Sequence, residues 1–484
     1  MTDLTEPSAP EHDDPVTVLG GGIAGSEAAW QLAARGIPVR LLEMRPDRSS
    51  PAHHTARLAE LVCSNSLKSD DPATASGVLK RELEALGSLM LACARATAVP
   101  AGAALAVDRT HFADLVTAVL ESHPLIDVRR EEACALPERG HVIVATGPLT
   151  SPALEPALSG LLGESRLHFF DAAAPIVDAA TLDRETVFAA SRYGKGGGAD
   201  YLNCPMDRDE YERFITALVA AQRMQAKDFE RKELFAACQP VEEIARTGPD
   251  SLRFGPMKPV GLTDPRTGHR PWAVVQLRPE NAAGTAYNLV GFQTNLTFPE
   301  QRRVFGMIPG LGGADFLRYG VMHRNTFIDA PRLLDDTLAV RATPRVRIAG
   351  QLAGTEGYLE AAAGGLVAAL GVVAARNGTE PLHLPPTTAF GALLAYATDP
   401  ATTAYQPMHV NYGIVPPLAQ RVRGKQERYA AYSARASEDL AGVLVGDRWG
   451  TEETADSLAA AIASALATID RVPAAARAVG TPAP

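Results

Sequence analysis

Residues 15–45 contain the feature that most restricts how this chain can fold. A short apolar run rich in β-branched residues, Val16–Leu19, is followed directly by glycines in a G-x-G-x-x-G spacing. A helical stretch from about residue 22 to residue 35 comes next and ends at Gly36, and a second apolar run leads to Glu43. A strand, a glycine turn, a helix and a second strand that ends in an acid predict a parallel βαβ unit that binds a dinucleotide.

Each part of this unit has a mechanical task. The first glycine permits a tight turn, the second lets the backbone approach a pyrophosphate, and the third lets the helix pack on the strand. The helix N-terminus offers free N–H groups to the phosphates. An acid at position 43 accepts hydrogen bonds from an adenosine ribose, which favours FAD or NAD over NADP. The residues that we expect at the cofactor here are Gly20, Gly21, Gly22, Ile23, Ala24, Gly25 and Glu43.

Two later segments favour FAD over NAD. Residues 141–152 predict a strand that ends in an Ala-Thr-Gly turn, and residues 345–370 predict a strand, a glycine loop and a helix of small residues. The N-terminus of such a helix points at the flavin ring of two-dinucleotide-fold flavoproteins, where its dipole stabilises a reduced, anionic flavin. An ordinary βα unit is the alternative interpretation, but the glycines before a helix with little bulk favour the flavin. The residues that these segments contribute are Thr146, Gly147, Gly350, Gly354, Glu356 and Gly357.

The two halves of this cofactor fold are separated by a long segment with a different sequence pattern. A chain of 484 residues is expected to form two or three domains, because a single core rarely grows past about 250–300 residues. The sequence therefore predicts an α/β protein with a FAD-binding Rossmann-type domain, of the two-dinucleotide-fold flavoprotein kind, interrupted by an α+β insertion domain. The expected divisions are a disordered tail (1–14), a discontinuous FAD-binding domain (15–170 and 330–445), an insertion domain (171–329), and a C-terminal helix with a disordered tail (446–484).

Composition excludes several classes of protein. With 46% hydrophobic residues and a net charge of −10, the chain is expected to be folded and soluble, and any binding of nucleic acid is expected at a local basic patch. The N-terminus is acidic and polar, without the pattern of a signal peptide, so a cytoplasmic location is expected. The apolar stretch 361–375 is shorter than the roughly 20 residues that span a bilayer, which predicts a buried helix and no membrane segment.

The cysteines are few and far apart. They are odd in number, no C-x-x-C motif occurs, and neither a disulfide framework nor a metal site is expected. Most buried free cysteines are small hydrophobic residues without chemistry. The five are Cys63, Cys93, Cys134, Cys204 and Cys238.

Three further segments each allow a functional and a structural interpretation. The glycine loop around Lys195 lacks the spacing of a P-loop and is either a mobile surface loop or a substrate contact. The polar group His323, Arg324 and Asn325 fits a planar ligand or a satisfied turn. Residues 420–436 predict a basic helix with a solvated face or a face that contacts RNA phosphates. Its candidate RNA-binding residues are Arg421, Arg423, Lys425 and Arg428.

Several long motifs together identify a family. They include "LVCSNSLKS" (61–69), "LRFGPMKPVGL" (252–262), "GFQTNLTFPEQRRVFGMIPGL" (291–311) and "YGVMHRNTF" (319–327). With the glycine fingerprint and the late strand–loop–helix, they resemble the folate- and FAD-dependent tRNA (uracil-5-)-methyltransferases, the TrmFO family. The resemblance covers roughly residues 15–440 and leaves both termini outside.

The resemblance implies a reaction, its co-substrates and its partner. A one-carbon unit from 5,10-methylenetetrahydrofolate is placed on C5 of the T-loop uridine at tRNA position 54, with reduced FAD as reductant and NADH or NADPH re-reducing the flavin. Cys63 and Cys238 match the family's catalytic pair, one attacking C6 and the other taking the C5 proton or trapping the methylene, with the division left open. The implied folate or substrate contacts are Lys195, Arg253, Lys258, His323, Arg324 and Asn325.

Cations near the two thiols are expected to favour thiolate: Lys68 beside Cys63, and Arg253 or Lys258 beside Cys238. Two rival functions remain at this point, a flavin-dependent oxidoreductase for a small molecule and a non-catalytic, FAD-stabilised tRNA-binding protein. A monomer or a homodimer fits the sequence equally.

Overall fold

The computed structural model describes residues 14–50, 52–163, 166–172, 174–224, 239–320, 322–402, 405–445, 449 and 451–469, and of residues 166–172, 322–325 and 451–453 only the backbone. Cys238 therefore lies outside the described residues, as do the side chains of the predicted ligand group His323, Arg324 and Asn325. The predicted N-terminal tail and the end of the C-terminal tail lie outside them as well.

A six-stranded sheet lies at the centre of the first lobe. Its order is β16 (Ala339–Val340), β17 (Thr343–Ile348), β7 (Val142–Val144), β1 (Val16–Leu19), β2 (Val39–Leu42), β6 (Ile126–Arg129). All neighbours run parallel except β16 and β17. The residues of β1 and β7 are all buried, as expected for central strands of a parallel sheet that is covered on both faces.

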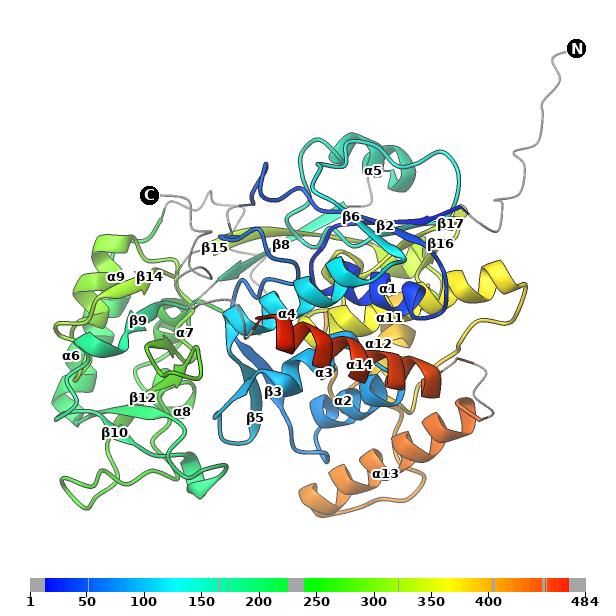
Figure 1. The fold of residues 1–484 in the computed structure, drawn as a ribbon. Helices are drawn as coiled ribbons and strands as arrows, with labels where there is room; N and C mark the ends of the chain where they lie inside the picture. The colour runs from blue at the N-terminus through cyan, green and yellow to red at the C-terminus, as the bar shows by residue number, and fades with distance from the viewer. Residues whose placement is uncertain are drawn as a thin grey trace, which may run out of the picture.

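Two helices of small residues pack tightly against each other beside this sheet. They are α1 (Ile23–Ala33) and α11 (Tyr358–Asn377), blue and yellow in Figure 1. A Cβ atom on Gly365 would lie 2.0 Å from the carbonyl oxygen of Ala24, so only glycine permits this approach. The predicted βαβ unit and the late strand–loop–helix are thus confirmed and lie side by side.

The first lobe contains eight further helices among the residues that the structure describes (Figure 1). They are α2 (Ala75–Ala85), α3 (Leu89–Ala96), α4 (Arg109–Ser122), α5 (Glu155–Leu162), α10 (Ala330–Leu333), α12 (Ala389–Thr398), α13 (Lys425–Val443) and α14 (Thr451–Ile469). A small antiparallel sheet, β3 (Ser66–Ser69), β5 (Ala104–Val107) and β4 (Ala98–Val99), lies beside α2 and α3. The expected C-terminal helix is therefore present as α14.

A second, antiparallel sheet forms the other lobe, on the left of Figure 1. Its order is β10 (Phe188–Ala189), β11 (Leu202–Met206), β12 (Ala273–Pro279), β13 (Ala286–Leu289), β9 (Ile176–Asp178), β14 (Phe316–Arg318). It carries α6 (Arg208–Ala220), α7 (Val241–Arg246), α8 (Ser251–Phe254) and α9 (Phe298–Phe305). The predicted fold class, a Rossmann-type α/β unit interrupted by an α+β segment, is confirmed.

The two lobes have separate cores and are joined by a strand pair. One buried apolar cluster surrounds the parallel sheet and another surrounds the antiparallel sheet. The connecting strands β8 (Arg166–Ala172) and β15 (Met322–Ile328) pair antiparallel between the lobes. The domain limits drawn from the sequence stay a prediction.

Helix α11 corrects one expectation about length. The apolar helix is 20 residues long, and it is the one helix among the described residues that is long and apolar enough to cross a membrane. However, 83% of its apolar window is buried inside the protein. Burial against α1, and not shortness, therefore explains its apolar character.

The basic helix predicted for 420–436 begins later than expected. Helix α13 starts at Lys425, after Gly424 in an extended conformation, so Arg421 and Arg423 precede it. The side chains of Arg421, Arg423 and Lys425 are exposed and Arg428 is half-buried.

Candidate functional site

A cavity that opens to solvent lies at the carboxyl ends of the parallel strands in the first lobe. Ligands bind at this edge of open α/β sheets. Most of the residues predicted to bind the cofactor line it: Gly20, Gly22, Ile23, Ala24, Glu43, Thr146, Gly147 and Gly350. The cavity is therefore the predicted dinucleotide site.

The glycine turn leaves room for a pyrophosphate. A Cβ atom on Gly22 or Gly147 would meet nothing within 4 Å, so both face open space. At Gly25 the same atom would lie 1.8 Å from the carbonyl oxygen of Gly20, which shows that this glycine serves close packing of helix on strand. The residues present fit a FAD molecule at its phosphates.

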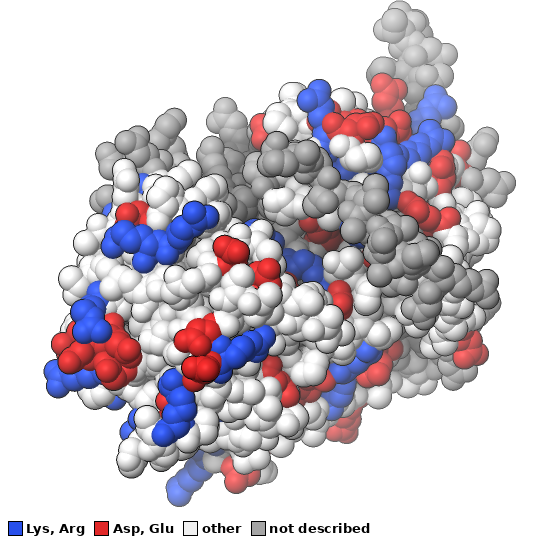
Figure 2. All heavy atoms as spheres, turned by 60° about the vertical axis from the view of Figure 1, so that its left-hand side comes forward, with Lys and Arg blue, Asp and Glu red and all other residues white. Residues whose placement is uncertain are grey.

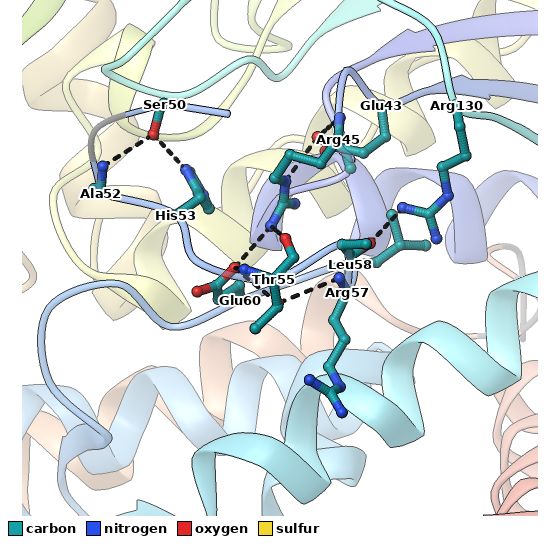
Figure 3. Close-up of polar contacts among 12 residues, drawn as sticks. Glu43, Arg45, Ser50, Ala52, His53, Thr55, Arg57, Leu58, Glu60 and Arg130 are labelled. Carbon is teal, nitrogen blue, oxygen red and sulfur yellow. Dashed lines mark hydrogen bonds and ion pairs between the residues drawn. The ribbon is translucent and has the colours of Figure 1, made fainter. Parts of the chain in front are cut away.

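Glu43 is held in place by a charged cluster at the edge of the cavity (Figure 3). One carboxylate oxygen accepts a hydrogen bond of 2.9 Å from the backbone N–H of Gly21, and the other accepts one of 2.8 Å from Nε of Arg45. Arg45 also binds Glu60 at 3.0 Å. Burial raises the pKa of the Glu43 carboxyl, but the bonds and charge of Arg45 outweigh burial and leave the pKa below its usual value. An ionised, oriented carboxylate thus faces the expected ribose position.

A neutral histidine completes this edge. His53 lines the cavity, and its Nδ1 lies 2.6 Å from Oγ of Ser50 (Figure 3). Burial and the charge of Arg45 lower the pKa of His53 to about 4. The ring is therefore uncharged at physiological pH and adds no positive charge to the site.

Three of the other residues predicted at the cofactor are not among the residues that line the cavity. Gly354 has a φ of +79° and contacts Tyr405, Glu356 accepts hydrogen bonds from Gln351, and Gly357 precedes the first residue of α11 with a φ of +118°. Their positions shape the turn that aims the N-terminus of α11.

The segment around Cys63 lies directly against this cavity. Its neighbour Val62 lines the cavity, and the backbone N–H of Cys63 donates a hydrogen bond of 2.9 Å to the hydroxyl of Tyr358. Tyr358 is the first residue of α11 and also lines the cavity. The half-buried Cys63 thus follows a residue of the cavity wall, and its backbone is bonded to the start of α11.

Three arginines from distant segments hold the Cys63 turn. The carbonyl oxygen of Cys63 accepts hydrogen bonds from Arg109 on α4 at 3.3 Å and from Arg318 on β14 at 2.9 Å. Arg278 on β12 donates to the side chains of Ser64 and Asn65 at 2.6 and 2.9 Å. The turn is therefore a joint between the two lobes.

One carboxylate partly balances these charges. Glu280 pairs with Arg109 at 2.7 Å, and the two side chains are 6% and 17% exposed. Burial lowers the pKa of the Arg109 guanidinium, but the charge of Glu280 outweighs it and raises the pKa overall. Burial also lowers the pKa values of Arg278 and Arg318. The described contacts of the Cys63 turn thus include three guanidinium groups, one of which is paired with a carboxylate.

Sequence reasoning missed these residues and assigned the nearby cation to Lys68. The ammonium of Lys68 instead lies 2.6 Å from Glu360 in the first turn of α11. Glu360 also accepts a hydrogen bond of 3.3 Å from the backbone N–H of Val410. Lys68 therefore connects the Cys63 segment to the helix that points at the cavity.

The other described cysteines have different surroundings. Cys93 and Cys204 are buried, and burial raises the pKa of both thiols. Cys134 is exposed. Within the described ranges, no group of three or more His, Cys, Asp or Glu residues is arranged to hold a metal ion.

The remaining predicted ligand residues lie on the second lobe. The guanidinium of Arg253 lies 3.8 Å from the ring centre of Trp272 and donates to its carbonyl oxygen. Lys195 and Lys258 are exposed. None of the three lines the dinucleotide cavity.

Comparison with known proteins agrees with this geometry. The family described as glucose inhibited division protein A matches residues 15–380. The methylenetetrahydrofolate--tRNA-(uracil-5-)-methyltransferase TrmFO of Moorella thermoacetica is 57% identical over 425 residues, which are 88% of this chain and 97% of that protein. The TrmFO of Geobacter sulfurreducens is 55% identical over 88% of this chain and 98% of that protein. The structure of Aquifex aeolicus GidA superposes with a TM-score of 0.65 at 18% identity, over 92% of this chain and 77% of that one, a likeness of fold.

Proposed function

The chain belongs to the glucose inhibited division protein A family and, within it, to the TrmFO methyltransferases, and on this premise we propose that it methylates C5 of a tRNA uridine. The carbon donor is 5,10-methylenetetrahydrofolate, the reductant is reduced FAD, and NADH or NADPH reduces the flavin again. The proposed target is the T-loop uridine at position 54, which becomes 5-methyluridine.

One structural observation supports this proposal in addition to the sequence similarity. The Cys63 turn is bonded to the first residue of α11, and both line or border the dinucleotide cavity. A flavoprotein that only oxidised a small molecule would have no use for a cysteine whose backbone carbonyl is held by arginines from both lobes. A pyrimidine, in contrast, needs a thiol at C6 before C5 becomes nucleophilic.

The chain's own residues have separate tasks in this proposal. The glycine turn and Glu43 hold the pyrophosphate and ribose of FAD, and the N-terminus of α11 points at its ring. Reduced FAD, when bound, would supply the electrons that convert the methylene unit to a methyl group. Cys63 and Cys238 share two roles, addition to C6 of uracil and removal of the C5 proton, and single substitutions distinguish which thiol does which.

We also propose which residues contact the substrates. For contacts with the substrate or with folate we propose the second-lobe group Lys195, Arg253, Lys258, His323, Arg324 and Asn325, and for RNA phosphates Arg421, Arg423, Lys425 and Arg428. Three of the latter are exposed on the segment that leads into α13, which suits phosphate contact. We further propose a cytoplasmic protein that is a monomer or a homodimer, with the domain limits given above.

A single assay separates this function from its rivals. Purified protein is incubated with unmodified tRNA, labelled methylenetetrahydrofolate and NADH, and the digested tRNA is examined by mass spectrometry. Label in 5-methyluridine supports the methyltransferase. NADH oxidation without label supports a small-molecule oxidoreductase, and tRNA binding with neither supports a non-catalytic protein.

The assigned thiols are tested with a matched control. Cys63→Ala and Cys238→Ala are expected to abolish label transfer while FAD stays bound. Cys134→Ala removes an exposed cysteine outside the site and is expected to leave transfer unchanged. Normal methylation by both single variants would refute the site assignment, even if the function holds.

A further inference from the structure

Tyr193 has an unusual backbone conformation on the surface of the second lobe. Its φ is +60°, in the left-handed region that residues with a Cβ atom rarely adopt, and its side chain is 68% exposed. An exposed aromatic side chain in a strained conformation gains nothing from burial. Strain of this kind persists where the surrounding structure fixes it, and it is concentrated at functional sites.

The surroundings fix Tyr193 in two ways. Its backbone N–H donates to the carbonyl oxygen of Gly261 at 3.0 Å. A Cβ atom on Gly261 would lie 3.0 Å from three atoms of the tyrosine ring, so the ring lies flat over a position that only glycine leaves open. One face of the tyrosine ring therefore lies against Gly261, and the opposite face points away from Gly261.

The loop that carries the ring is also braced against the first lobe. The carboxylate of Asp200 accepts hydrogen bonds from the backbone N–H groups of Gly102, at 2.6 Å, and Gly197, at 3.1 Å. The hydroxyl of Tyr201 donates to the carbonyl oxygen of Ala101 at 2.8 Å. The predicted alternative of a mobile surface loop is therefore not supported by its contacts.

Basic residues belong to the two segments that meet at the ring. Lys195 follows in the same turn, and Arg192 donates at 2.6 Å to the carbonyl oxygen of Lys258, whose own side chain is exposed. The same segment presents Phe254, which is 74% exposed. On the face of the second lobe shown in Figure 2, basic and acidic side chains are interspersed, so nucleic acid would have to be bound at a local group of this kind.

We propose that Tyr193 is a stacking platform for an unpaired nucleobase of the tRNA substrate, with Lys195 and Lys258 contacting the adjoining phosphates. This inference rests on the proposed function and names a second contact for the same substrate. Single-stranded and looped RNA is recognised by stacking on exposed aromatic rings beside basic residues. A folate ring would be expected in an enclosed pocket, whereas Tyr193 lies outside the dinucleotide cavity and faces solvent.

Three substitutions of one residue separate stacking from loop structure. Tyr193→Ala removes the ring, Tyr193→Gly removes the ring and also relieves the positive φ, and Tyr193→Phe keeps the ring. The dissociation constant of the FAD-loaded protein for an unmodified tRNA transcript is expected to rise about 5- to 150-fold for Ala and Gly alike. Tyr193→Phe is expected to bind as the wild type does, and KM for methylenetetrahydrofolate is expected to stay constant in all three.

The phosphate contacts are tested through salt. The double variant Lys195→Ala/Lys258→Ala is expected to reduce the slope of log binding constant against log salt by about 1 to 2. Arg332→Ala, which removes an exposed cation near β15, is expected to leave the slope unchanged.

Four outcomes would overturn the inference. The first is wild-type tRNA affinity in both Tyr193→Ala and Tyr193→Gly, and the second is a loss of tRNA affinity in Tyr193→Ala that Tyr193→Gly recovers. The third is a rise in KM for methylenetetrahydrofolate with unchanged tRNA affinity. The fourth is a wild-type protein that binds no tRNA. The last would refute the proposed function as well. A wild type that binds tRNA through Tyr193 but transfers no label would refute the proposed function alone.

Discussion

The hydroxyl oxygen of Tyr358 accepts a hydrogen bond of 2.9 Å from the backbone N–H of Cys63, across 295 residues of chain. Burial raises the pKa of Tyr358, and the neighbouring charge of Cys63 adds to the shift. The phenol is therefore neutral at physiological pH and fixes the Cys63 turn to the start of α11. The position of the thiol thus depends on the helix that points at the cofactor cavity.

Tyr358→Phe should reduce methylation without releasing FAD. The substitution keeps the ring but leaves the Cys63 N–H without its acceptor, which costs about 1–3 kcal/mol for a buried group. We expect the single-turnover rate to fall about tenfold, since that range includes the 1.4 kcal/mol that corresponds to a factor of ten. Flavin absorbance per mole of protein should stay constant.

The matched control is Tyr412→Phe. The hydroxyl of Tyr412 donates at 2.8 Å to the carbonyl oxygen of Ala73, away from the cavity. It should cost similar stability and leave the rate unchanged. Equal rates in both variants would show that the Tyr358 contact does not position the thiol.

Arg109 and Arg318 bind the same carbonyl oxygen but should differ in their effect on stability. Arg109→Ala leaves the carboxylate of Glu280 buried without its partner, which typically costs about 3–5 kcal/mol. Arg318→Ala removes a hydrogen bond to Cys63 and should cost about 1 kcal/mol. Urea unfolding of the FAD-loaded proteins measures both.

A double variant tests the cause of this difference. Adding Glu280→Ala to Arg109→Ala removes the unpaired charge and should recover part of the lost unfolding free energy. If Glu280→Ala lowers the unfolding free energy of the Arg109→Ala variant as much as it lowers that of the wild type, the unpaired buried charge is not the reason for the difference.

The cofactor half of the site could be predicted from the sequence because its signals are local. Strand, glycine turn, helix and terminal acid are contiguous in residues 15–45, and their spacing carries the chemistry. The structure places Glu43 at the cavity edge as expected. The start of the C-terminal basic helix was missed because a charge pattern does not reveal that the chain is still extended at Gly424.

The arginine joint could not be predicted because its members come from three distant segments. Arg109 lies 46 residues from Cys63 and Arg318 lies 255 residues from it. An isolated arginine on a helix or edge strand most often faces solvent, and no periodicity marks these two as partners of one carbonyl. Sequence proximity suggested Lys68, whose ammonium binds Glu360 in the folded chain.

Glu43→Gln should weaken FAD binding. An amide places an N–H₂ group where a carboxylate oxygen now accepts from Gly21 or Arg45, so one of these contacts becomes repulsive. We expect purified protein to contain less flavin and the dissociation constant for added FAD to rise at least tenfold, as for loss of a charge-assisted bond. Fluorescence titration of the apoprotein provides the value.

The control for this variant is Glu121→Gln. Glu121 pairs with Arg130 at 2.6 Å, but its side chain is 47% exposed and it lies outside the cavity. It should retain flavin as the wild type does. Full flavin content in Glu43→Gln would contradict the ribose role of this acid.

The contribution of Glu82 to the free energy of unfolding should decrease as pH rises toward neutrality. Its buried carboxyl on α2 accepts hydrogen bonds of 2.6 and 2.9 Å from the backbone N–H groups of Ala389 and Phe390, at the start of α12. Burial raises its pKa to about 7, against the opposing effect of these bonds. Between pH 4.5 and about 7 the folded state therefore retains a proton that the unfolded chain releases.

Because the folded state binds more protons in this window, the contribution of Glu82 is complete below pH 4.5 and is lost as pH rises through about 7. Its slope is at most about 1.4 kcal/mol per pH unit. Glu82→Gln removes the titration, so the wild-type advantage in unfolding free energy over this variant should shrink as pH rises from about 4.5 to about 7. The control Glu84→Gln changes an exposed acid on the same helix and should leave the pH profile of the wild type unaltered. Parallel profiles for the wild type and Glu82→Gln would show that this carboxyl does not titrate in the window, and that α12 is capped by an ionised acid throughout.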